Sequence, residues 1–330
     1  MIEIVSTGPL NTIQDLGRPG YRNIGVTACG AMDTLALRIG NILAGNAPDA
    51  AGIEVQTFPF RVRFFERGAF AVTGADCRAT LDGVPLPPWW VTEAQAGQVL
   101  EFSPPLKDAR ACLCLAGGVD VAPVMGSRST SLRGGFGGME GRVLAAGDRI
   151  ATGTAAGGFL PKGGFGVVPP ATALKDVFPV AEGGALIIRA LPAGEHDLFG
   201  TDAERFWGQP WKISARSDRT GYRLSGDPIH PTEVVEMRSH GVVPGVIQVP
   251  PAGEPIVQMS DANTAGGYPK IAGVIEADLW RLGQARIGSL LRFMPATHAE
   301  AKAVETALTA YVADVQKTAR LVRQALAAMA

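Results

Sequence analysis

The chain is predicted to be mainly β and to contain about two domains. Its 330 residues include 42 glycines and 24 prolines, which are spread through the chain and separate short β-rich runs. Short strands punctuated by turn residues are typical of all-β domains. Typical domains contain roughly 100–200 residues, so this length suggests about two of them.

The predicted strands begin at the first residue and end near residue 293. In order, they are MIEIVST, FRVRFF, GAFAVTG, QVLEF, ACLCLAGGV, ALIIRAL, WKISA, GVIQV, PIVQM and SLLRF. In ACLCLAGGV, Cys112 and Cys114 lie two residues apart and therefore point to the same face of the strand. We interpret them as buried, reduced thiols, because the further ligands that a metal site needs do not lie nearby.

Two helices are predicted. In segment 33–46, Leu35 and Ile39 belong to an apolar series at helical spacing, Asp33 is a candidate N-cap, and Gly45 lies at the end. The C-terminal segment repeats apolar residues at the same spacing, at Val304, Leu308, Tyr311, Val315 and Val322. We expect this longer helix to pack on a sheet or on a partner protein.

These elements divide the chain into four predicted parts. Residues 1–150 form an N-terminal β lobe, and residues 185–296 form a C-terminal β lobe. Between them, residues 151–184 are rich in Gly and Pro and low in charge, so they are predicted to connect the lobes. Residues 297–330 form the C-terminal helix.

The charge of the chain is balanced. Thirty basic and 31 acidic residues leave a net charge of −1. This excludes the strongly basic surface with which nonspecific nucleic-acid binders and polybasic membrane binders act. The first residues lack the pattern of a signal peptide, and no apolar run approaches the length that spans a membrane. We therefore expect a cytoplasmic protein that binds neither nucleic acid nor membrane.

Several common chemical motifs are missing. The sequence contains no P-loop, no H-E-x-x-H and no G-x-S-x-G motif, and its four histidines are scattered. The segment GGFGGMEGR (134–142) is rich in glycine but lacks the P-loop lysine, so we interpret it as a tight loop; a nucleotide site is the alternative. No metal site is predicted.

Two polar segments in the first lobe are candidate site residues. In TIQDLGRPG (12–20), Gln14, Asp15 and Arg18 lie within five residues. Asp15 and Arg18 either form a salt bridge that locks the fold or clamp a substrate carboxylate. Asp33 either caps the helix that follows it or offers a carboxylate at the mouth of that helix.

Two further polar segments lie in the second lobe. SDRTGYR (217–223) contains Ser217, Asp218, Arg219 and Tyr222 around a glycine. QMSDANTAGGYPK (258–270) contains Gln258, Asp261, Thr264 and Tyr268 around Gly266 and Gly267, which is more donors and acceptors than a chain reversal needs. The planar guanidinium of arginine, with its paired N–H donors, suits a planar, anionic group such as a carboxylate, carbamate or carboxyphosphate.

The chain also resembles a known family over most of its length. The resemblance lies in segments that recur in order: GPLNTIQDLGRPGYRNIGVTACGAMDTLALRIGNILAGN, VTGAD, LAGGVDVAPVMGSRST, GGMEGRVLAAGDRI, SDRTGYRLSG, GVIQVPPAGEPIVQMSDANTAGGYPKIAGVIEADL and IGSLLRF. The family goes by three names: allophanate hydrolase subunit 2, biotin-dependent carboxyltransferase, and the C subunit of 5-oxoprolinase. The resemblance implies two β-barrel-like lobes related to cyclophilin. It also implies a B-subunit-like partner, a protein of the allophanate hydrolase subunit 1 family.

The resemblance implies an enzyme component that acts on a small amide. A separate chain of this length favours an ATP-dependent 5-oxoprolinase complex, in which a cyclic amide is opened to glutamate with the B-subunit-like partner and a further hydrolase subunit. The alternatives are a carboxyltransferase that moves CO2 from carboxybiotin to urea or a similar amide, and a regulatory antagonist of a histidine kinase. ATP would bind on the partner or at the interface with it. Biotin would arrive on another protein, since the chain has no Met-Lys-Met motif.

The polar segments suit such an amide, because its activation requires stabilisation of charge that grows on the carbonyl oxygen or nitrogen. We expect an acid to orient or deprotonate the nitrogen and an arginine to face the oxygen. The predicted catalytic residues are Asp218, Arg219, Asp261 and Tyr268. The predicted substrate-binding residues are Gln14, Asp15, Arg18, Asp33, Ser217, Tyr222, Gln258 and Thr264.

Overall fold

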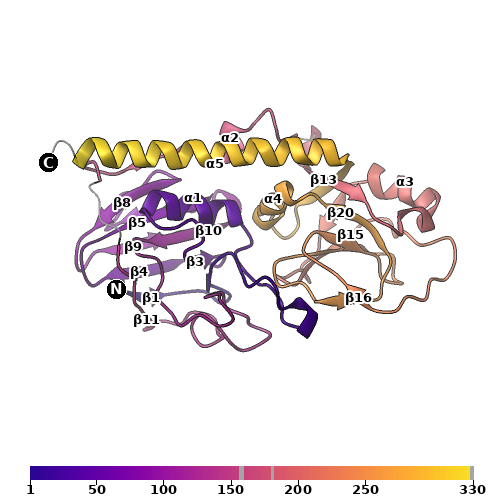
Figure 1. Ribbon diagram of the computed structural model, residues 1–330, viewed down its shortest axis with the longest axis horizontal. Coiled ribbons are helices and arrows are strands. Elements are labelled where there is room, and N and C mark those ends of the chain that lie inside the picture. The colour runs from indigo at the N-terminus through magenta and orange to yellow at the C-terminus, as the bar shows by residue number, and fades with distance from the viewer. Residues whose placement is uncertain (156–159, 180–181, 328–330) are drawn as a thin grey trace. The chain divides into compact units, whose positions relative to one another are not determined.

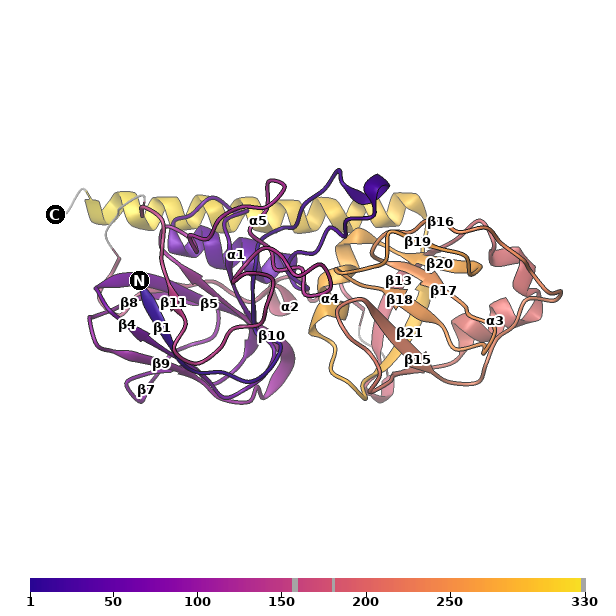
Figure 2. The same cartoon turned by 90° about the horizontal axis from the view of Figure 1, so that it is seen from below.

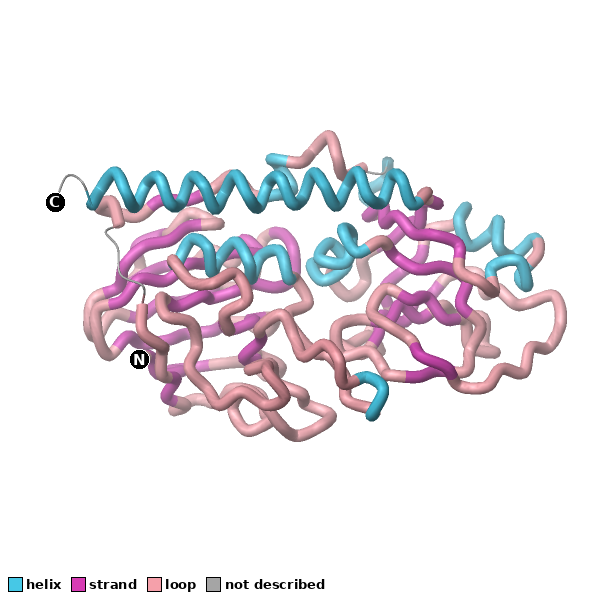
Figure 3. Tube along the Cα trace, viewed as in Figure 1, coloured by secondary structure: helices cyan, strands magenta, loops and turns pink. Residues whose placement is uncertain are grey.

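The computed structural model describes residues 1–155, 160–179 and 182–327. The chain is built mainly from strands and loops (Figure 3), so the predicted class is confirmed. Its residues group into two compact units: unit 1 contains Met1–Arg18, Cys29–Ala173 and Ala310–Ala330, and unit 2 contains Pro19–Ala28 and Leu174–Thr309. The change from Ala173 to Leu174 falls in segment 151–184, of which residues 156–159 and 180–181 lie outside the described residues.

Unit 1 contains two six-stranded sheets, with the strand orders β11-β1-β4-β9-β6-β7 and β12-β8-β5-β10-β3-β2. The strands of the first sheet are β1 (Ile2–Ser6), β4 (Phe60–Phe64), β6 (Thr80–Leu81), β7 (Val84–Pro85), β9 (Val99–Phe102) and β11 (Arg149–Ile150). The strands of the second sheet are β2 (Thr12–Gln14), β3 (Gly52–Val55), β5 (Gly68–Asp76), β8 (Trp90–Ala94), β10 (Lys107–Leu115) and β12 (Phe165–Gly166).

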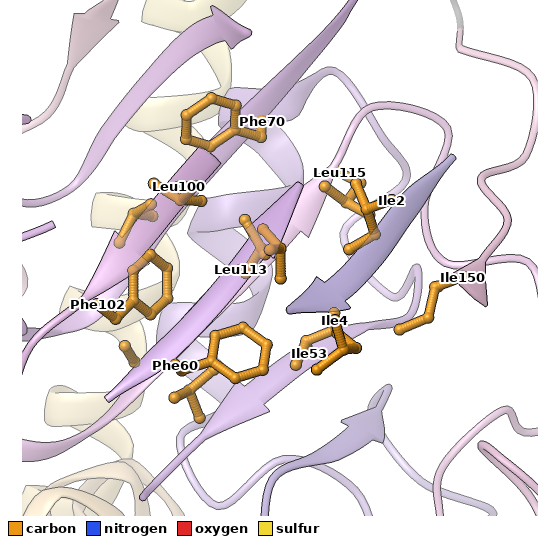
Figure 4. Close-up of a cluster of buried hydrophobic side chains, with 14 of the residues drawn as sticks. Ile2, Ile4, Ile53, Phe60, Phe70, Leu100, Phe102, Leu113, Leu115 and Ile150 are labelled. Atoms are coloured by element: carbon orange, nitrogen blue, oxygen red, sulfur yellow. The ribbon is translucent and has the colours of Figure 1, made fainter. Parts of the chain in front are cut away.

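One apolar core is built from both sheets of unit 1. In β4, Phe60, Val62 and Phe64 are buried, whereas Arg61 and Arg63 between them are exposed. Residues two apart on a strand share a face, so this alternation gives β4 an apolar side. Figure 4 shows labelled members of the core: Ile2, Ile4, Ile53, Phe60, Phe70, Leu100, Phe102, Leu113, Leu115 and Ile150.

Helix α1 (Thr34–Ala44) packs on β5 and β10 of the second sheet (Figure 1). Asp33 caps it, since its Oδ1 accepts a hydrogen bond from the Ala36 N–H at 2.8 Å. On the strands below, Thr73 donates to the Ala36 carbonyl at 2.7 Å, and the Cys114 thiol donates to the Leu37 carbonyl at 3.7 Å. Cys112 and Cys114 are fully buried free thiols, as predicted.

Unit 2 contains a closed barrel with the strand order β13-β20-β17-β18-β15-β14-β21. Its strands are β13 (Leu186–Pro192), β14 (Trp211–Ile213), β15 (Gly221–Ser225), β17 (Val246–Gln248), β18 (Ile256–Gln258), β20 (Lys270–Val274) and β21 (Leu290–Pro295). A short ribbon pairs β16 (His240–Gly241) with β19 (Ala265–Gly266), and the two lie side by side in Figure 2. The first barrel strand begins at Leu186 and the last one ends at Pro295.

Short helices complete the two units. In unit 2 they are η1 (Arg22–Ile24), η2 (Glu182–Gly184), η3 (His196–Phe199), α3 (Thr201–Gly208), η4 (Glu276–Asp278) and α4 (Leu279–Gln284), and in unit 1 there is α2 (Pro170–Ala173). The predicted C-terminal helix is α5 (His298–Ala327), whose residues to Thr309 belong to unit 2 and whose later residues belong to unit 1. Of the side chains in α5 whose burial is described, Val304, Val315 and Ala319 are buried, in agreement with the predicted spacing. Among the described residues, none of the helices has both the length and the apolar character that are needed to cross a bilayer.

Candidate functional site

Two of the predicted catalytic residues, Arg219 and Asp261, form an ion pair through two hydrogen bonds. Arg219 donates through Nε to Oδ2 at 3.1 Å and through its NH2 group to Oδ1 at 3.0 Å. The two side chains are only 7% and 13% exposed. The Asp261 N–H also donates to the Arg219 carbonyl at 2.9 Å. This two-point pairing fixes the plane of the guanidinium and holds the loop after β18 against the loop before β15.

Ser217 and Asp218 organise the turn that leads into β15. Asp218 Oδ1 accepts from the N–H groups of Thr220 at 2.7 Å and Gly221 at 3.2 Å. Ser217 Oγ accepts from the Arg223 N–H at 3.0 Å and donates to the Arg223 carbonyl at 3.3 Å. Short polar side chains commonly stabilise turns in this way. Both predicted site residues thus serve the local backbone.

One face of β18, β17 and β20 carries several polar side chains. Ile256 pairs with Gln248, and Gln248 pairs with Lys270, so these residues and Gln258 share one face of the barrel wall. Gln258 Nε2 donates to Gln248 Oε1 at 3.1 Å, and Gln248 Nε2 donates to the Tyr268 carbonyl at 3.3 Å. This relay leaves Gln258 Oε1 as a buried acceptor for which the described residues supply no donor.

Lys270 lies at the end of this polar face in a cluster with Glu195 and His240. Its ammonium is 3.0 Å from Glu195 Oε2 and contacts His240 Nε2, while its backbone N–H donates to Glu195 Oε2 at 3.2 Å. The other ring nitrogen of His240, Nδ1, is 3.0 Å from the Arg238 carbonyl. The Lys270 and Glu195 side chains are 16% and 21% exposed, so the cluster is neither fully buried nor fully solvated.

The remaining predicted residues of unit 2 are placed apart from this face or at its rim. Tyr222 pairs with Val257, which belongs to the opposite face of β18 from Gln258, and it is 1% exposed. It therefore packs inside the barrel. Tyr268 is 45% exposed, and the Thr264 carbonyl accepts from the Val242 N–H at 3.2 Å.

In unit 1, Asp15 organises the segment 127–129. Its Oδ1 accepts from the hydroxyls of Ser127 at 2.6 Å and Ser129 at 2.5 Å and from the Gly17 N–H at 2.8 Å. Its Oδ2 accepts from the Arg128 N–H at 2.6 Å. Hydroxyl and backbone donors therefore bind the Asp15 carboxylate. The salt-bridge interpretation had expected the Arg18 guanidinium in their place.

Arg18 and Gln14 contact the same segment. Arg18 is 1% exposed, donates to the carbonyls of Val124 at 3.3 Å and Ser129, and stacks on Phe136 with its Cζ 4.9 Å from the ring centre. Gln14 donates to the Thr130 carbonyl at 3.3 Å. The structure thus brings together Gln14, Asp15 and Arg18 within unit 1, and each holds residues 124–130 in place.

Asp33 lies in a buried acidic region that the sequence did not reveal. Besides the Asp33 cap, Glu54 accepts from the Met32 N–H at 2.6 Å, and its Oε1 is 4.0 Å from Arg110 Nε. Burial raises the pKa of the neighbouring Cys112 thiol, and the negative charges of Asp33 and Glu54 add to this effect. The hydrogen bond from the Ala36 N–H to Asp33 Oδ1 confirms the capping interpretation of Asp33.

The glycine-rich loop 134–142 is packed against itself. The N–H of Gly138 donates to the Arg128 carbonyl at 3.0 Å, and the N–H of Gly141 donates to the Gly137 carbonyl at 2.6 Å. A Cβ at Gly137 would lie 2.2 Å from the Ser129 carbonyl oxygen. A phosphate cradle requires backbone N–H groups that point at the ligand. This loop does not fit a nucleotide, and the tight-loop interpretation holds.

Glu195, His240 and Lys270 are not among the site residues predicted from the sequence. Glu195 lies 75 residues before Lys270, between a strand and the turn η3, and nothing in its local sequence indicates a charged partner. Lys270 belongs to the fourth polar segment, but only the closed barrel brings it to Glu195 and His240.

The fold is that of a carboxyltransferase domain. Residues 24–295 match the family described as "Carboxyltransferase domain, subdomain A and B", and the chain belongs to this family. It is 42% identical over 306 residues to the C subunit of 5-oxoprolinase from Escherichia coli, a match that covers 91% of this chain and 93% of the relative. It is 39% identical to the C subunit of 5-oxoprolinase from Haemophilus influenzae, where the match covers 96% and 98%.

Larger enzymes contain a similar domain. The crystal structure of the Kluyveromyces lactis urea carboxylase superposes with a TM-score of 0.84 at 26% identity, over 95% of this chain and 29% of that one. The K. lactis urea amidolyase superposes with a TM-score of 0.82 at 26% identity, over 95% and 20%. This chain therefore spans less than a third of these two proteins, but nearly the whole length of the 5-oxoprolinase relatives.

Proposed function

We propose that this protein is the C-type subunit of an ATP-dependent 5-oxoprolinase complex. In this role it activates a small cyclic amide for ring opening to glutamate, together with a B-subunit-like partner and a hydrolase subunit. The observation that carries the proposal is the end-to-end similarity to two 5-oxoprolinase relatives of this type, at 42% and 39% identity. The urea amidolyase relatives are less similar, and this chain covers only 18% of one of them.

The polar face of unit 2 supports an amide as substrate. An amide presents a carbonyl acceptor and an N–H donor, and its resonance must be overcome before it reacts. Gln258 offers a buried acceptor that an amide N–H would satisfy, and the nearby loop holds Arg219 in a fixed orientation through Asp261. We assign Arg219 to polarisation of the carbonyl and Asp261 to the positioning of Arg219. Fixed donors of this kind stabilise charge that develops in the transition state.

The nucleotide is assigned to a partner. Since the loop 134–142 donates its N–H groups to the chain's own carbonyls, we derive no step at ATP from the residues of this chain. The test is co-expression of the three subunits, followed by measurement of ADP release with 5-oxoproline and with urea. The proposal predicts release that requires 5-oxoproline and all three subunits. Release stimulated by urea alone would contradict it.

A second candidate function is carboxyl transfer from carboxybiotin to urea or a similar amide. The match of residues 24–295 to a carboxyltransferase family and the superposition on the urea carboxylase favour it. Biotin would then be carried by another protein. Bicarbonate-dependent carboxylation of urea, with a biotin carboxylase and a biotinylated carrier supplied, would distinguish this function from the first.

A further inference from the structure

We propose that Lys270 and His240 are the proton-transfer pair of the amide-activating site, with Glu195 as the residue that positions Lys270. The inference rests on the proposed function, which it extends by naming the groups that move protons. The three side chains come from β20, from β16 and from the residue before η3, so only the folded barrel assembles them.

The hydrogen-bond partners define the protonation pattern of the cluster. A carbonyl oxygen can only accept, so His240 Nδ1, at 3.0 Å from the Arg238 carbonyl, carries the hydrogen. In the neutral ring Nε2 then has a lone pair, and it accepts from the Lys270 ammonium. The same ammonium donates to Glu195 Oε2 at 3.0 Å. One proton therefore lies between two nitrogen bases.

A pair of this kind can pass a proton between its two nitrogen atoms. Transfer from Lys270 Nζ to His240 Nε2 leaves the net charge of the cluster unchanged, and Glu195 stays beside either cation. Lysine and histidine both serve as general acids or bases. Arginine cannot, because it stays charged at all ordinary pH values.

The location of the pair suits the proposed reaction. Lys270 pairs with Gln248 across the sheet, and Gln248 accepts from Gln258, whose Oε1 is the buried acceptor without a donor among the described residues. Ring opening adds one water across the C–N bond. The pair accepts a proton from the water as its oxygen bonds to the carbonyl carbon, and it returns a proton to the ring nitrogen as the C–N bond breaks.

The first test uses the three-subunit complex. Lys270→Arg keeps the positive charge and the donors to Glu195, so a purely structural ion pair would survive it. The inference predicts that kcat falls by about 10²–10⁴-fold while KM changes little. Lys212→Arg, at an exposed lysine of β14 in the same barrel, is the matched control and should behave as the wild type. A Lys270→Arg complex with wild-type kcat would overturn the inference and leave the proposed function standing.

Glu195 is tested by the pH profile. The titratable groups of the cluster are Glu195, Lys270 and His240, and loss of the negative charge in Glu195→Gln disfavours the protonated pair. The acidic limb of the kcat profile should therefore move to lower pH. A lower kcat with an unmoved limb would mean that Glu195 has only a structural role, which contradicts its assignment.

A spectroscopic readout does not depend on activity. With ¹⁵N-labelled histidine, the chain has only four histidines to assign. His240 should show the neutral tautomer with hydrogen on Nδ1, and Lys270→Met should shift its Nε2 resonance, whereas Lys212→Met should not. The opposite tautomer would overturn the proton path. A wild-type complex without 5-oxoproline-dependent turnover would instead contradict the proposed function itself.

Discussion

Asp261 accepts both arms of the Arg219 guanidinium, at 3.1 Å from Nε and 3.0 Å from the NH2 group. The pair joins two loops that are 42 residues apart in the chain and lie at the same end of β15 and β18. Each charge is neutralised by the other, so the loops can be held together with little solvent access. Substitution of either Arg219 or Asp261 should therefore affect stability as well as turnover.

The first prediction concerns this pair. Asp261→Ala should lower the free energy of unfolding by about 3 kcal/mol, because it leaves the Arg219 charge in a mostly buried place without its partner. Arg219→Met combined with Asp261→Leu should cost clearly less than Asp261→Ala alone, since no uncompensated charge remains. Urea denaturation measures both. Equal losses in the single and double variants would show that the charge pairing does not determine stability here.

The second prediction concerns Asp148. Arg142 donates to both of its oxygens, at 2.7 and 2.8 Å, and this pairing lowers the pKa of the Asp148 carboxyl. Because the folded-state pKa lies below the unfolded one, the stabilisation is present above about pH 4 and is lost as the pH falls through the folded pKa.

Asp148→Asn should therefore cost about 1 kcal/mol at neutral pH and progressively less in acid. Denaturation curves over a pH series measure the difference. Asp49→Asn, which alters an exposed carboxylate, serves as the control. A difference between wild type and Asp148→Asn that stays constant down to acid pH would refute the pairing.

The third prediction concerns the thiols. All four cysteines are buried thiols, and burial raises the pKa of Cys77 and Cys114 to about 12. The thiolate is the reactive form, so the native protein should not react with a disulfide reagent at about pH 8. All four thiols should react in denaturant. Val234→Cys, at a residue that is 97% exposed, should add one thiol that reacts rapidly in the native protein. This variant shows that the reagent is active.

The fourth prediction compares two glycines with positive φ. A Cβ at Gly117 (φ +87°) would lie 2.1 Å from the Gly153 carbonyl oxygen, whereas a Cβ at Gly147 (φ +90°) has open space around it. Gly147→Ala should cost about 1 kcal/mol from backbone strain alone. Gly117→Ala should cost at least about 2 kcal/mol more, because the backbone must also move. Similar midpoints in urea for the two variants would contradict this account of the close approach.

Local patterns predicted much of the fold. The helix with Asp33 as its cap, the strand with Cys112 and Cys114 on one face, and the C-terminal helix with Val304 and Val315 all follow from spacing and capping, which act within a few residues. Strand β15 was not predicted. Gly221 and Arg223 interrupt its series of apolar residues, so the segment has the composition of a polar turn.

The site could be predicted only in part. The polar segments were found, but the role of each residue depends on partners that are distant in sequence: Asp15 on Ser127 and Ser129, and Asp261 on Arg219. Tyr222 illustrates the limit, since its position in a polar segment suggested a site residue and strand pairing places it in the barrel core. Glu195 carries no local signal at all.

The most direct test of the central claim measures glutamate and ADP together. The two partner proteins are supplied with ATP and 5-oxoproline, first without this chain and then with it at increasing concentration. The account predicts that glutamate forms only with this chain, in proportion to the ADP released, and saturates once the partners are fully bound. Glutamate formation at the same rate without this chain would contradict the account.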